Sequence, residues 1–217
     1  MKYQAVIFDL DGTLLDTLED LKNSVNVAMD AMGFPQRTLE EVRRFVGNGV
    51  AKLIERAVPS DTDEETVKQT LAAFKEHYFL HCEDHTRPYE GVLNLLDALL
   101  EQGIKIAVVS NKTDAAVKSL CKRYFGDRIS LAVGDREGMA KKPSPDAIFA
   151  VLDEWHISAE DAVYIGDSEV DIFTAQNAKM EMICVTWGFR DRDFLSQNGA
   201  TAFADSAENL KNWIFEK

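Results

Sequence analysis

Short apolar runs alternate with amphipathic stretches along most of this chain. Five runs are rich in β-branched residues and short enough to be buried strands; they cover residues 5–8, 104–109, 129–133, 162–165 and 182–185. Stretches with apolar residues at three- and four-residue spacing, typical of helices packed on a core, cover residues 91–102, 113–125, 145–155, 169–178 and 206–215. Because strands and helices alternate, we predict an α/β fold with a doubly wound parallel sheet.

Residues 17–85 depart from this alternation, because they contain no convincing strand. Three threonines there each precede an acid by three positions, a spacing typical of helix N-termini; the pairs are Thr17 with Asp20, Thr38 with Glu41, and Thr62 with Glu65. We therefore expect a helical domain of residues 17–85 inserted into an α/β core of residues 1–16 and 86–217. Two linkers would join them and allow a hinge.

Composition and charge narrow the possible partners. The chain has 24 Lys and Arg against 37 Asp and Glu, and its formal net charge of -13 opposes binding to nucleic acid or to an anionic membrane surface. Its three cysteines lie far apart and form no C-x-x-C pair, which fits a reducing compartment. The first residues offer neither a signal peptide nor a membrane span. These features predict a cytoplasmic protein.

Acidic side chains follow the first predicted strand. Asp9 and Asp11 are two residues apart on an extended chain, so their side chains share a face and can converge on one bound group. Gly12 permits a tight turn through which the backbone can approach a ligand. This arrangement suits a nucleophile beside a proton donor.

Polar residues also end the later strands, where ligands bind in open α/β sheets. Ser110 and Asn111 precede a helix start, which holds phosphate well, although Asn111 could equally cap that helix. Lys142 could neutralise both a carboxylate and a phosphoryl group. Asp167 and Asp171 invite a hard cation. We predict removal of a phosphoryl group through a covalent aspartyl intermediate.

These segments resemble the four motifs of the haloacid dehalogenase superfamily, in the phosphatase branch that carries a helical cap after the first motif. The resemblance implies that Asp9 is the nucleophile and that Asp11 is the general acid and then the general base. It also implies that Ser110 binds phosphate and that Lys142 neutralises charge. Residues 17–85 would then be the cap.

The same resemblance implies a Mg²⁺ cofactor. The metal ligands would be the carboxylates of Asp9 and Asp167 and the backbone carbonyl of Asp11. Asp171 and Thr13 would orient these ligands without binding the metal themselves. Mg²⁺ and a lysine are needed because a phosphate dianion repels a carboxylate nucleophile.

The helical domain contains a glycine-rich turn at residues 45–50, flanked by basic residues. It could be a simple turn between helices, but we expect it to contact substrate. The expected substrate-binding residues, in the core and the cap, are Ser110, Asn111, Gly12, Arg44, Gly47, Asn48 and Lys52. The Val46–Gly49 sequence looks most like phosphoglycolate phosphatases. Val46 and Val50 stand where related sugar-phosphate mutases carry basic residues, which disfavours a mutase.

A histidine stripe and a helix end without glycine also stand out in the sequence. His77, His81 and His85 recur at four-residue spacing and could place metal ligands on one helix face, but a solvated stripe is the favoured interpretation. Lys179 replaces the glycine that usually closes the helix after the fourth motif, so the left-handed turn expected there is in doubt.

We therefore expect a Mg²⁺-dependent phosphatase that acts on a small phosphorylated metabolite, without a nucleic-acid or membrane partner. Phosphoglycolate is the first candidate, and pyrophosphate or a sugar phosphate is the alternative. From a different class, a phospho-acceptor signalling domain uses similar residues but needs no helical cap. The pattern predicts neither the physiological substrate nor the oligomeric state.

Overall fold

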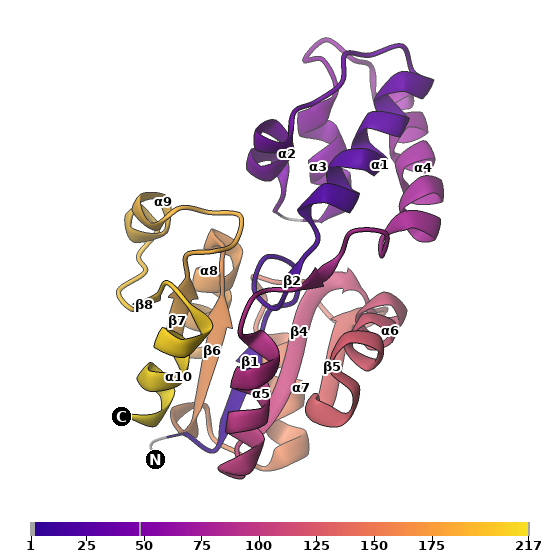
Figure 1. The fold of residues 1–217 in the computed structure, drawn as a ribbon. Coiled ribbons are helices and arrows are strands. Elements are labelled where there is room, and N and C mark those ends of the chain that lie inside the picture. The colour runs from indigo at the N-terminus through magenta and orange to yellow at the C-terminus, as the bar shows by residue number, and fades with distance from the viewer. Residues whose placement is uncertain (1–2, 48, 217) are drawn as a thin grey trace. The chain divides into compact units, whose positions relative to one another are not determined.

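A computed structural model describes residues 3–47 and 49–216, and the chain divides into two compact units (Figure 1). The sheet unit consists of residues 1–15 and 88–217, and the helical unit of residues 16–87. No helix in the described part of the chain combines the length and the apolar character needed to cross a bilayer.

The sheet unit is built on a parallel sheet. In the described residues this sheet has six strands in the order β5-β4-β1-β6-β7-β8. Their bounds are β1 Ala5–Phe8, β4 Lys105–Thr113, β5 Leu131–Asp135, β6 Ala162–Gly166, β7 Glu181–Val185 and β8 Phe203–Ala204. The central strand β1 pairs in parallel with β4 and with β6. All four of its residues are apolar and fully buried, as expected for a strand covered on both faces.

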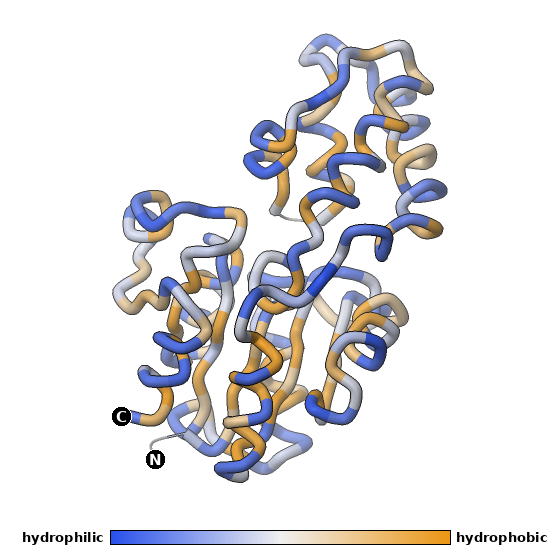
Figure 2. The backbone as a smooth tube through the Cα atoms, in the orientation of Figure 1, coloured by the Kyte–Doolittle hydropathy of each residue, from blue (hydrophilic) through white to orange (hydrophobic). Residues whose placement is uncertain are grey.

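Helices cover both faces of this sheet. Val6 and Phe8 enter one apolar cluster, together with side chains of α5, α6 and α10. Ala5 and Ile7 enter the other cluster, together with side chains of α7 and α8. Figure 2 shows the apolar strands between more polar helix surfaces. The helices are α5 Val92–Glu101, α6 Asp114–Phe125, α7 Asp146–Trp155, α8 Glu169–Ala178, α9 Arg192–Gln197 and α10 Ala207–Phe215, with the 3-10 turns Gly126–Arg128 and Ala159–Asp161. The predicted doubly wound α/β fold is confirmed.

The structure corrects several predicted boundaries. The strand predicted at residues 129–133 is Leu131–Asp135, because a 3-10 turn over Gly126–Arg128 delays its start. Strand β4 continues to Thr113 with a shift of register after Val109. Strand β8 and helix α9 were not predicted, since two and six residues are too short to show a period.

Lys179 closes α8 in the left-handed conformation, with φ 53° and ψ 42°. The left-handed turn that was in doubt because Lys179 replaces glycine therefore does form. The N–H of Met180 donates to the carbonyl of Ala175 at 2.9 Å, so the usual closing hydrogen bonds form without glycine.

The helical unit contains α1 Leu18–Ala31, α2 Leu39–Phe45, α3 Val50–Ala57 and α4 Glu64–His81. They share a core of buried apolar side chains that includes Val25, Met29, Ile54 and Phe74. Two short strands, β2 Leu15–Asp16 and β3 Arg87–Pro88, pair with each other in a second sheet.

Two of the three predicted helix starts are confirmed. Thr38 and Glu41 form a reciprocal capping box at α2. Thr17 directly precedes α1, as predicted, but it makes no side-chain cap, so the capping box with Asp20 was wrong. The prediction for Thr62 was also wrong, because Asp63 caps α4 by accepting from the N–H of Thr66 at 2.9 Å.

Candidate active site

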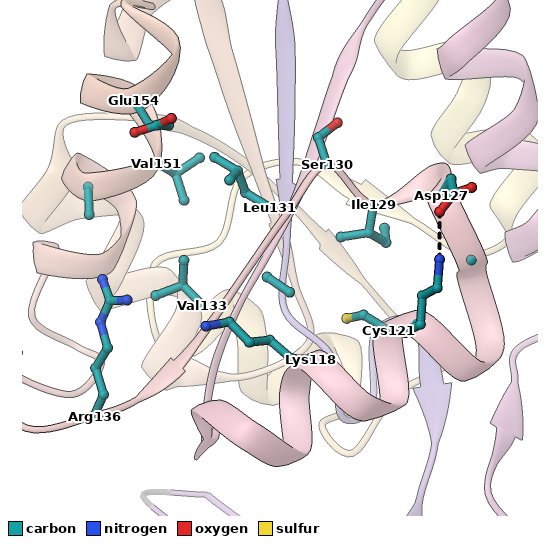
Figure 3. Close-up of a pocket in the computed structure, with 14 residues that line it drawn as sticks. Lys118, Cys121, Asp127, Ile129, Ser130, Leu131, Val133, Arg136, Val151 and Glu154 are labelled. Atoms are coloured by element: carbon teal, nitrogen blue, oxygen red, sulfur yellow. Dashed lines mark hydrogen bonds and ion pairs between the residues drawn. The ribbon is translucent and has the colours of Figure 1, made fainter.

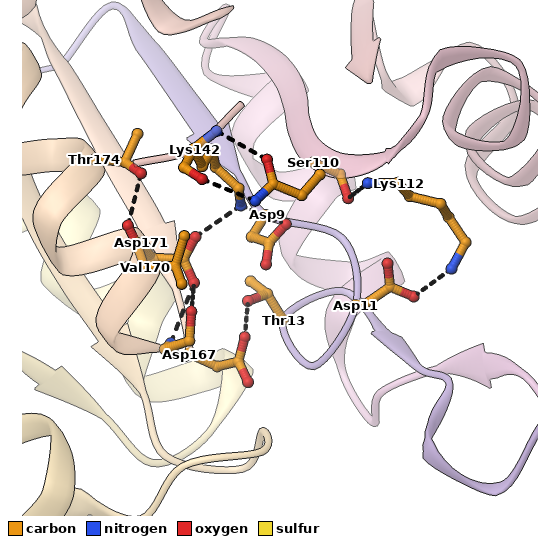
Figure 4. Close-up of polar contacts among 12 residues, drawn as sticks. Asp9, Asp11, Thr13, Ser110, Lys112, Lys142, Asp167, Val170, Asp171 and Thr174 are labelled. Atoms are coloured by element: carbon orange, nitrogen blue, oxygen red, sulfur yellow. Dashed lines mark hydrogen bonds and ion pairs between the residues drawn. The ribbon is translucent and has the colours of Figure 1, made fainter. Parts of the chain in front are cut away.

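The predicted nucleophile lies at the end of the central strand. The N–H of Asp9 donates to the carbonyl of Ile165 at 2.8 Å, which extends the pairing of β1 with β6 by one residue. The Asp9 carboxylate is almost buried and its Oδ1 lies 2.8 Å from the Nζ of Lys142 (Figure 4). The sheet therefore fixes the backbone of Asp9, and an ammonium group fixes its side chain.

Asp171 is fully buried in the first turn of α8 and accepts several hydrogen bonds. Its Oδ1 accepts from Lys142 Nζ at 2.8 Å and from the Tyr164 hydroxyl at 3.0 Å. Its Oδ2 accepts from the N–H of Ser168 at 3.1 Å. These bonds leave Asp171 suited to holding Lys142 in place.

Both carboxylate oxygens of Asp167 accept hydrogen bonds. Thr13 Oγ1 donates to its Oδ1 at 3.2 Å, and the N–H of Phe189 donates to its Oδ2 at 2.7 Å. A Cβ on Gly12 or on Gly188 would overlap the Asp167 carboxylate. Close backbone approach therefore explains why these two positions are glycine.

Asp9, Asp167 and Asp171 form a compact acidic group. Their nearest carboxylate oxygens lie within 4.8 Å of one another, and within the described residues this is the one group of three or more acidic, His or Cys side chains that could hold a metal ion. Oxygen ligands at this spacing suit a hard cation.

The electrostatics of this group favour a bound cation. Burial raises the pKa of Asp9 to about 7; Lys142 opposes this effect, while Asp171 adds to it. Burial, followed by the charges of Asp171 and Asp9, raises the pKa of Asp167 well above its usual value. A divalent ion would stabilise these carboxylates in their charged form.

Lys142 remains an ammonium despite its burial. Burial by itself lowers the pKa of this lysine, but the charges of Asp171 and Asp9 outweigh it and hold the pKa well above its usual value. Its backbone is fixed by Asn111, whose Oδ1 accepts from the Lys142 N–H at 2.8 Å and whose Nδ2 donates to the Lys142 carbonyl at 3.0 Å. Asn111 therefore holds Lys142 and does not cap α6; its contact with substrate stays a prediction.

Ser110 is buried where the regular pairing of β4 stops, and its Oγ accepts from the N–H of Lys112 at 3.2 Å. Sequence reasoning missed two ion pairs around the site. Lys112 Nζ lies 2.8 Å from Asp11 Oδ1, and Arg190 Nε lies 3.0 Å from Glu169 Oε2. Lys112 directly follows the predicted site residues Ser110 and Asn111, so the sequence could have indicated its role. Nothing in the local sequence marks Arg190 as part of the site.

A model of the haloacid dehalogenase-like hydrolase family matches residues 6–185 of this chain. The chain belongs to the haloacid dehalogenase-like hydrolase family. The phosphoglycolate phosphatase of Aliivibrio fischeri is 33% identical over 212 residues, which cover 94% of this chain and 93% of that protein. The predicted resemblance to the phosphatases of the family, and the predicted enzyme class, are confirmed.

Solved structures agree with this assignment. A phosphoglycolate phosphatase candidate from Lactobacillus delbrueckii subsp. bulgaricus superposes with a TM-score of 0.96 at 37% identity, over 100% of both chains. CbbY from Rhodobacter sphaeroides, solved in complex with phosphate, superposes with a TM-score of 0.75 at 26% identity, over 96% of both chains.

The described site residues predicted in the helical unit each have a partner within that unit. Arg44 pairs with Glu40 at 3.1 Å, and Lys52 pairs with Glu55 at 2.6 Å. The Gly47 carbonyl accepts from Arg56 at 3.2 Å. Asn48 lies outside the described residues. For this member of the hydrolase family, substrate contact by these four residues stays a prediction.

The histidine stripe does not continue along one helix, because α4 ends at His81. His77 Nδ1 lies 2.9 Å from Ser24 Oγ, and His81 Nδ1 lies 2.8 Å from Asp84. His85, beyond the helix, instead bonds Asp20 at 2.9 Å. The expectation of three histidines on one helix face was wrong for His85.

A separate groove of about 470 Å³ lies along β5, between α6 and α7 (Figure 3). Of the described residues predicted for the hydrolase site, none lines this groove. Its only thiol is that of Cys121, whose pKa burial raises to about 12, so this sulfur is an unreactive thiol at neutral pH.

Proposed function

We propose that this protein hydrolyses a small phosphate monoester through a phosphoryl intermediate on Asp9, with phosphoglycolate as the first candidate substrate. The observation that carries the proposal is the buried Asp9 carboxylate 2.8 Å from Lys142 Nζ, inside the acidic group with Asp167 and Asp171. The names of the relatives support the choice of phosphoglycolate. Pyrophosphate and sugar phosphates are the alternatives.

In the first step, a carboxylate oxygen of Asp9 attacks phosphorus and the bond from phosphorus to the ester oxygen breaks. Asp11 gives a proton to the departing alkoxide. Lys142 neutralises part of the negative charge between Asp9 and the phosphoryl group, and Ser110 donates a hydrogen bond to a phosphoryl oxygen. The product alcohol then leaves.

In the second step, water attacks phosphorus and the bond between phosphorus and Asp9 breaks. Asp11, now a carboxylate, takes a proton from this water. Inorganic phosphate leaves and Asp9 is regenerated as a carboxylate. One residue therefore acts as acid and then as base.

The acidic group fits Mg²⁺, because its oxygens are close together and burial disfavours their charges without a cation. Asp9, Asp167 and the Asp11 carbonyl would hold the ion, while Asp171 and Thr13 would orient Lys142 and Asp167. When bound, Mg²⁺ supplies positive charge to the phosphoryl oxygens. Its presence is part of this proposal.

We also propose that the helical unit serves as a cap that selects substrate, with its boundaries at residues 17 and 85. Arg44, Gly47, Asn48 and Lys52 would contribute. This assignment rests on the insertion of the helical unit after the first motif.

Release of inorganic phosphate from phosphoglycolate, pyrophosphate and several sugar phosphates tests the proposal. Asp9→Asn should reduce turnover by roughly a thousandfold or more, because an amide oxygen is a poor nucleophile. Asp153→Asn, at an exposed position of α7, is the matched control and should remain active. A wild-type protein that forms a stable acyl phosphate without turnover would instead be a phospho-acceptor domain. Substantial activity in the Asp9 variant would refute its role as nucleophile.

A further inference from the structure

Lys112, near the end of β4, makes an ion pair that the steps above do not use. Its Nζ lies 2.8 Å from Asp11 Oδ1, and the two side chains are 13% and 19% exposed. Figure 4 shows the Asp11 carboxylate directed toward Lys112 and away from Asp9. To give a proton to the ester oxygen of the substrate, and later to take one from water, Asp11 must face the phosphorus atom beside Asp9. In the observed orientation, the Asp11 carboxylate is turned away from that position.

The backbone of β4 explains how Lys112 reaches Asp11. The pairing of β4 with β5 shifts register between Val109 and Thr113, so residues 110–112 do not follow the regular alternation of a strand. Such irregularities redirect side chains and are common beside active sites. The N–H of Lys112 donates to Ser110 Oγ at 3.2 Å, which places Lys112 beside the predicted phosphate-binding residue.

The two lysines of the site differ in how deeply they are buried. Lys142 Nζ lies 2.8 Å from both Asp9 and Asp171, and its side chain is only 4% exposed. In the pair of Lys112 with Asp11, the two side chains are 13% and 19% exposed, so this pair is more accessible to solvent. An anion arriving from solvent can therefore compete for Lys112 much more readily than for Lys142.

The net negative charge of the protein makes an accessible ammonium group important for binding an anionic substrate. With a net charge of -13, the protein repels anionic substrates unless a local cation receives them. At Lys112, an incoming carboxylate can take the place of the Asp11 carboxylate, so the ammonium keeps a negatively charged partner. The exchange would also free Asp11 at the moment when a substrate is in place.

We propose that Lys112 is an exchange latch: it holds Asp11 away from Asp9 until a second anionic group of the substrate takes the ammonium and releases Asp11. This inference rests on the proposed function. It narrows the substrate class to phosphate monoesters that carry a carboxylate or another acidic group close to the ester oxygen. Phosphoglycolate has this chemistry, whereas a neutral sugar phosphate does not.

Kinetics with two substrates test the latch. In Lys112→Met, KM for phosphoglycolate should rise roughly ten- to hundredfold, the effect of losing one charge-assisted hydrogen bond. KM for p-nitrophenyl phosphate should change less than about twofold, since this substrate has no second anion. Its kcat should rise, because Asp11 is no longer held away from Asp9 and hydrolysis of the intermediate needs Asp11 as base. Lys112→Arg should recover most of the affinity for phosphoglycolate.

Lys118→Met is the matched control, because Lys118 pairs with Asp114 on α6 at 2.6 Å. It should leave both substrates unaffected. Equal changes in KM for both substrates in Lys112→Met, or no change for either, would overturn the latch. A wild-type protein that releases phosphate from no monoester would overturn the proposed function instead, so the two failures are distinguishable.

A crystal structure gives a readout that does not depend on activity. Asp9→Asn with bound phosphoglycolate should show Lys112 Nζ about 3 Å from the substrate carboxylate. Asp11 should then be separated from Lys112. A Lys112–Asp11 pair that stays intact beside the bound substrate would contradict the proposal, whatever the kinetics show.

Discussion

At the scale of single residues, Asp167 shows how closely the chain surrounds one carboxylate. Thr13 and the N–H of Phe189 bond its two oxygens, and these donors come from segments that are far apart in sequence. Gly12 and Gly188 leave no room for a Cβ beside it. The position of this proposed metal ligand is therefore determined by the backbone on both sides.

Gly188→Ala should displace Asp167, because the new Cβ would overlap the Asp167 side chain and the Gly12 carbonyl. We expect the Mg²⁺ concentration for half-maximal phosphate release to rise roughly 10- to 100-fold, the usual effect of disturbing the surroundings that orient a metal ligand. Gly103→Ala is the control: its φ of 73° strains an alanine, but no atom lies within 4 Å. That variant should lose stability and keep the wild-type Mg²⁺ titration; the same Mg²⁺ shift in both variants would rule out the steric explanation.

Lys179 offers a second prediction for a single residue. Because it adopts φ 53° at the end of α8, Lys179→Gly should remove left-handed strain and raise the free energy of unfolding by about 1 kcal/mol. Lys118→Gly inside α6 should lower it by about 1 kcal/mol. Urea denaturation measures both. Destabilisation by the two variants alike would show that the turn carries no strain.

At the scale of elements, Asp20 joins the first helix of the helical unit to the last residues of that unit in sequence. This buried carboxylate in the first turn of α1 accepts from the N–H groups of His85 and Thr86 and from the Thr86 hydroxyl, at 2.8 to 3.1 Å. Its spacing from Thr17 predicted a capping box, and the structure gives it this different role. Burial alone would raise the pKa of Asp20, but the bonds from Thr86 and His85 outweigh burial and lower it.

Asp20→Asn should therefore destabilise the helical unit by about 2 to 3 kcal/mol at pH 7, because an amide satisfies these donors poorly. The folded-state pKa of Asp20 lies below its unfolded value of 3.8. The stabilisation is thus complete above that value and is lost as pH falls through the folded-state pKa. The difference between wild type and variant should shrink at acidic pH.

Hydrogen exchange of the amides in α1 and α4 measures this difference. Tryptophan fluorescence would not report on the helical unit, because all tryptophans lie outside it. Asp84→Asn, which alters the pair with exposed His81, is the control and should change exchange little at pH 7. A penalty for Asp20→Asn that stays constant down to acidic pH would contradict the assignment.

At the scale of the whole molecule, the proposed site residues lie at the carboxyl ends of the strands, as expected for an open parallel sheet. Asp9 follows β1 and Asp167 follows β6, while Ser110 ends the regular part of β4. These strands are neighbours in the order β4-β1-β6. The sheet therefore gathers residues that are more than 150 positions apart in sequence into one site.

Metal removal tests the site as a unit. Chelation should reduce phosphate release by roughly a thousandfold or more, because Mg²⁺ supplies several kcal/mol of charge stabilisation. Added Mg²⁺ should restore it, while Ca²⁺ should not, since its larger coordination shell fits a different geometry. The chelated protein should remain folded by circular dichroism. Full activity after chelation would contradict the assignment of the acidic group as a metal site.

The sequence by itself determined the α/β class, the alternation that winds helices on both faces, and the strand-end position of the acids. These features are local: a buried strand such as β1 is apolar at every position, and a strand end is marked by the polar residue that follows it. The four motifs that suggested the family lie in the same short segments.

Only the tertiary structure decided which of these residues touch. The pairs of Lys112 with Asp11, Asn111 with Lys142, and Arg190 with Glu169 join segments whose separation no periodicity encodes. They depend on the register of β4 beside β1 and on the path of the loop after β7. Contacts of this kind arise when packing fixes the backbone, because side chains of a few ångströms in length meet only where strands and loops have already been placed.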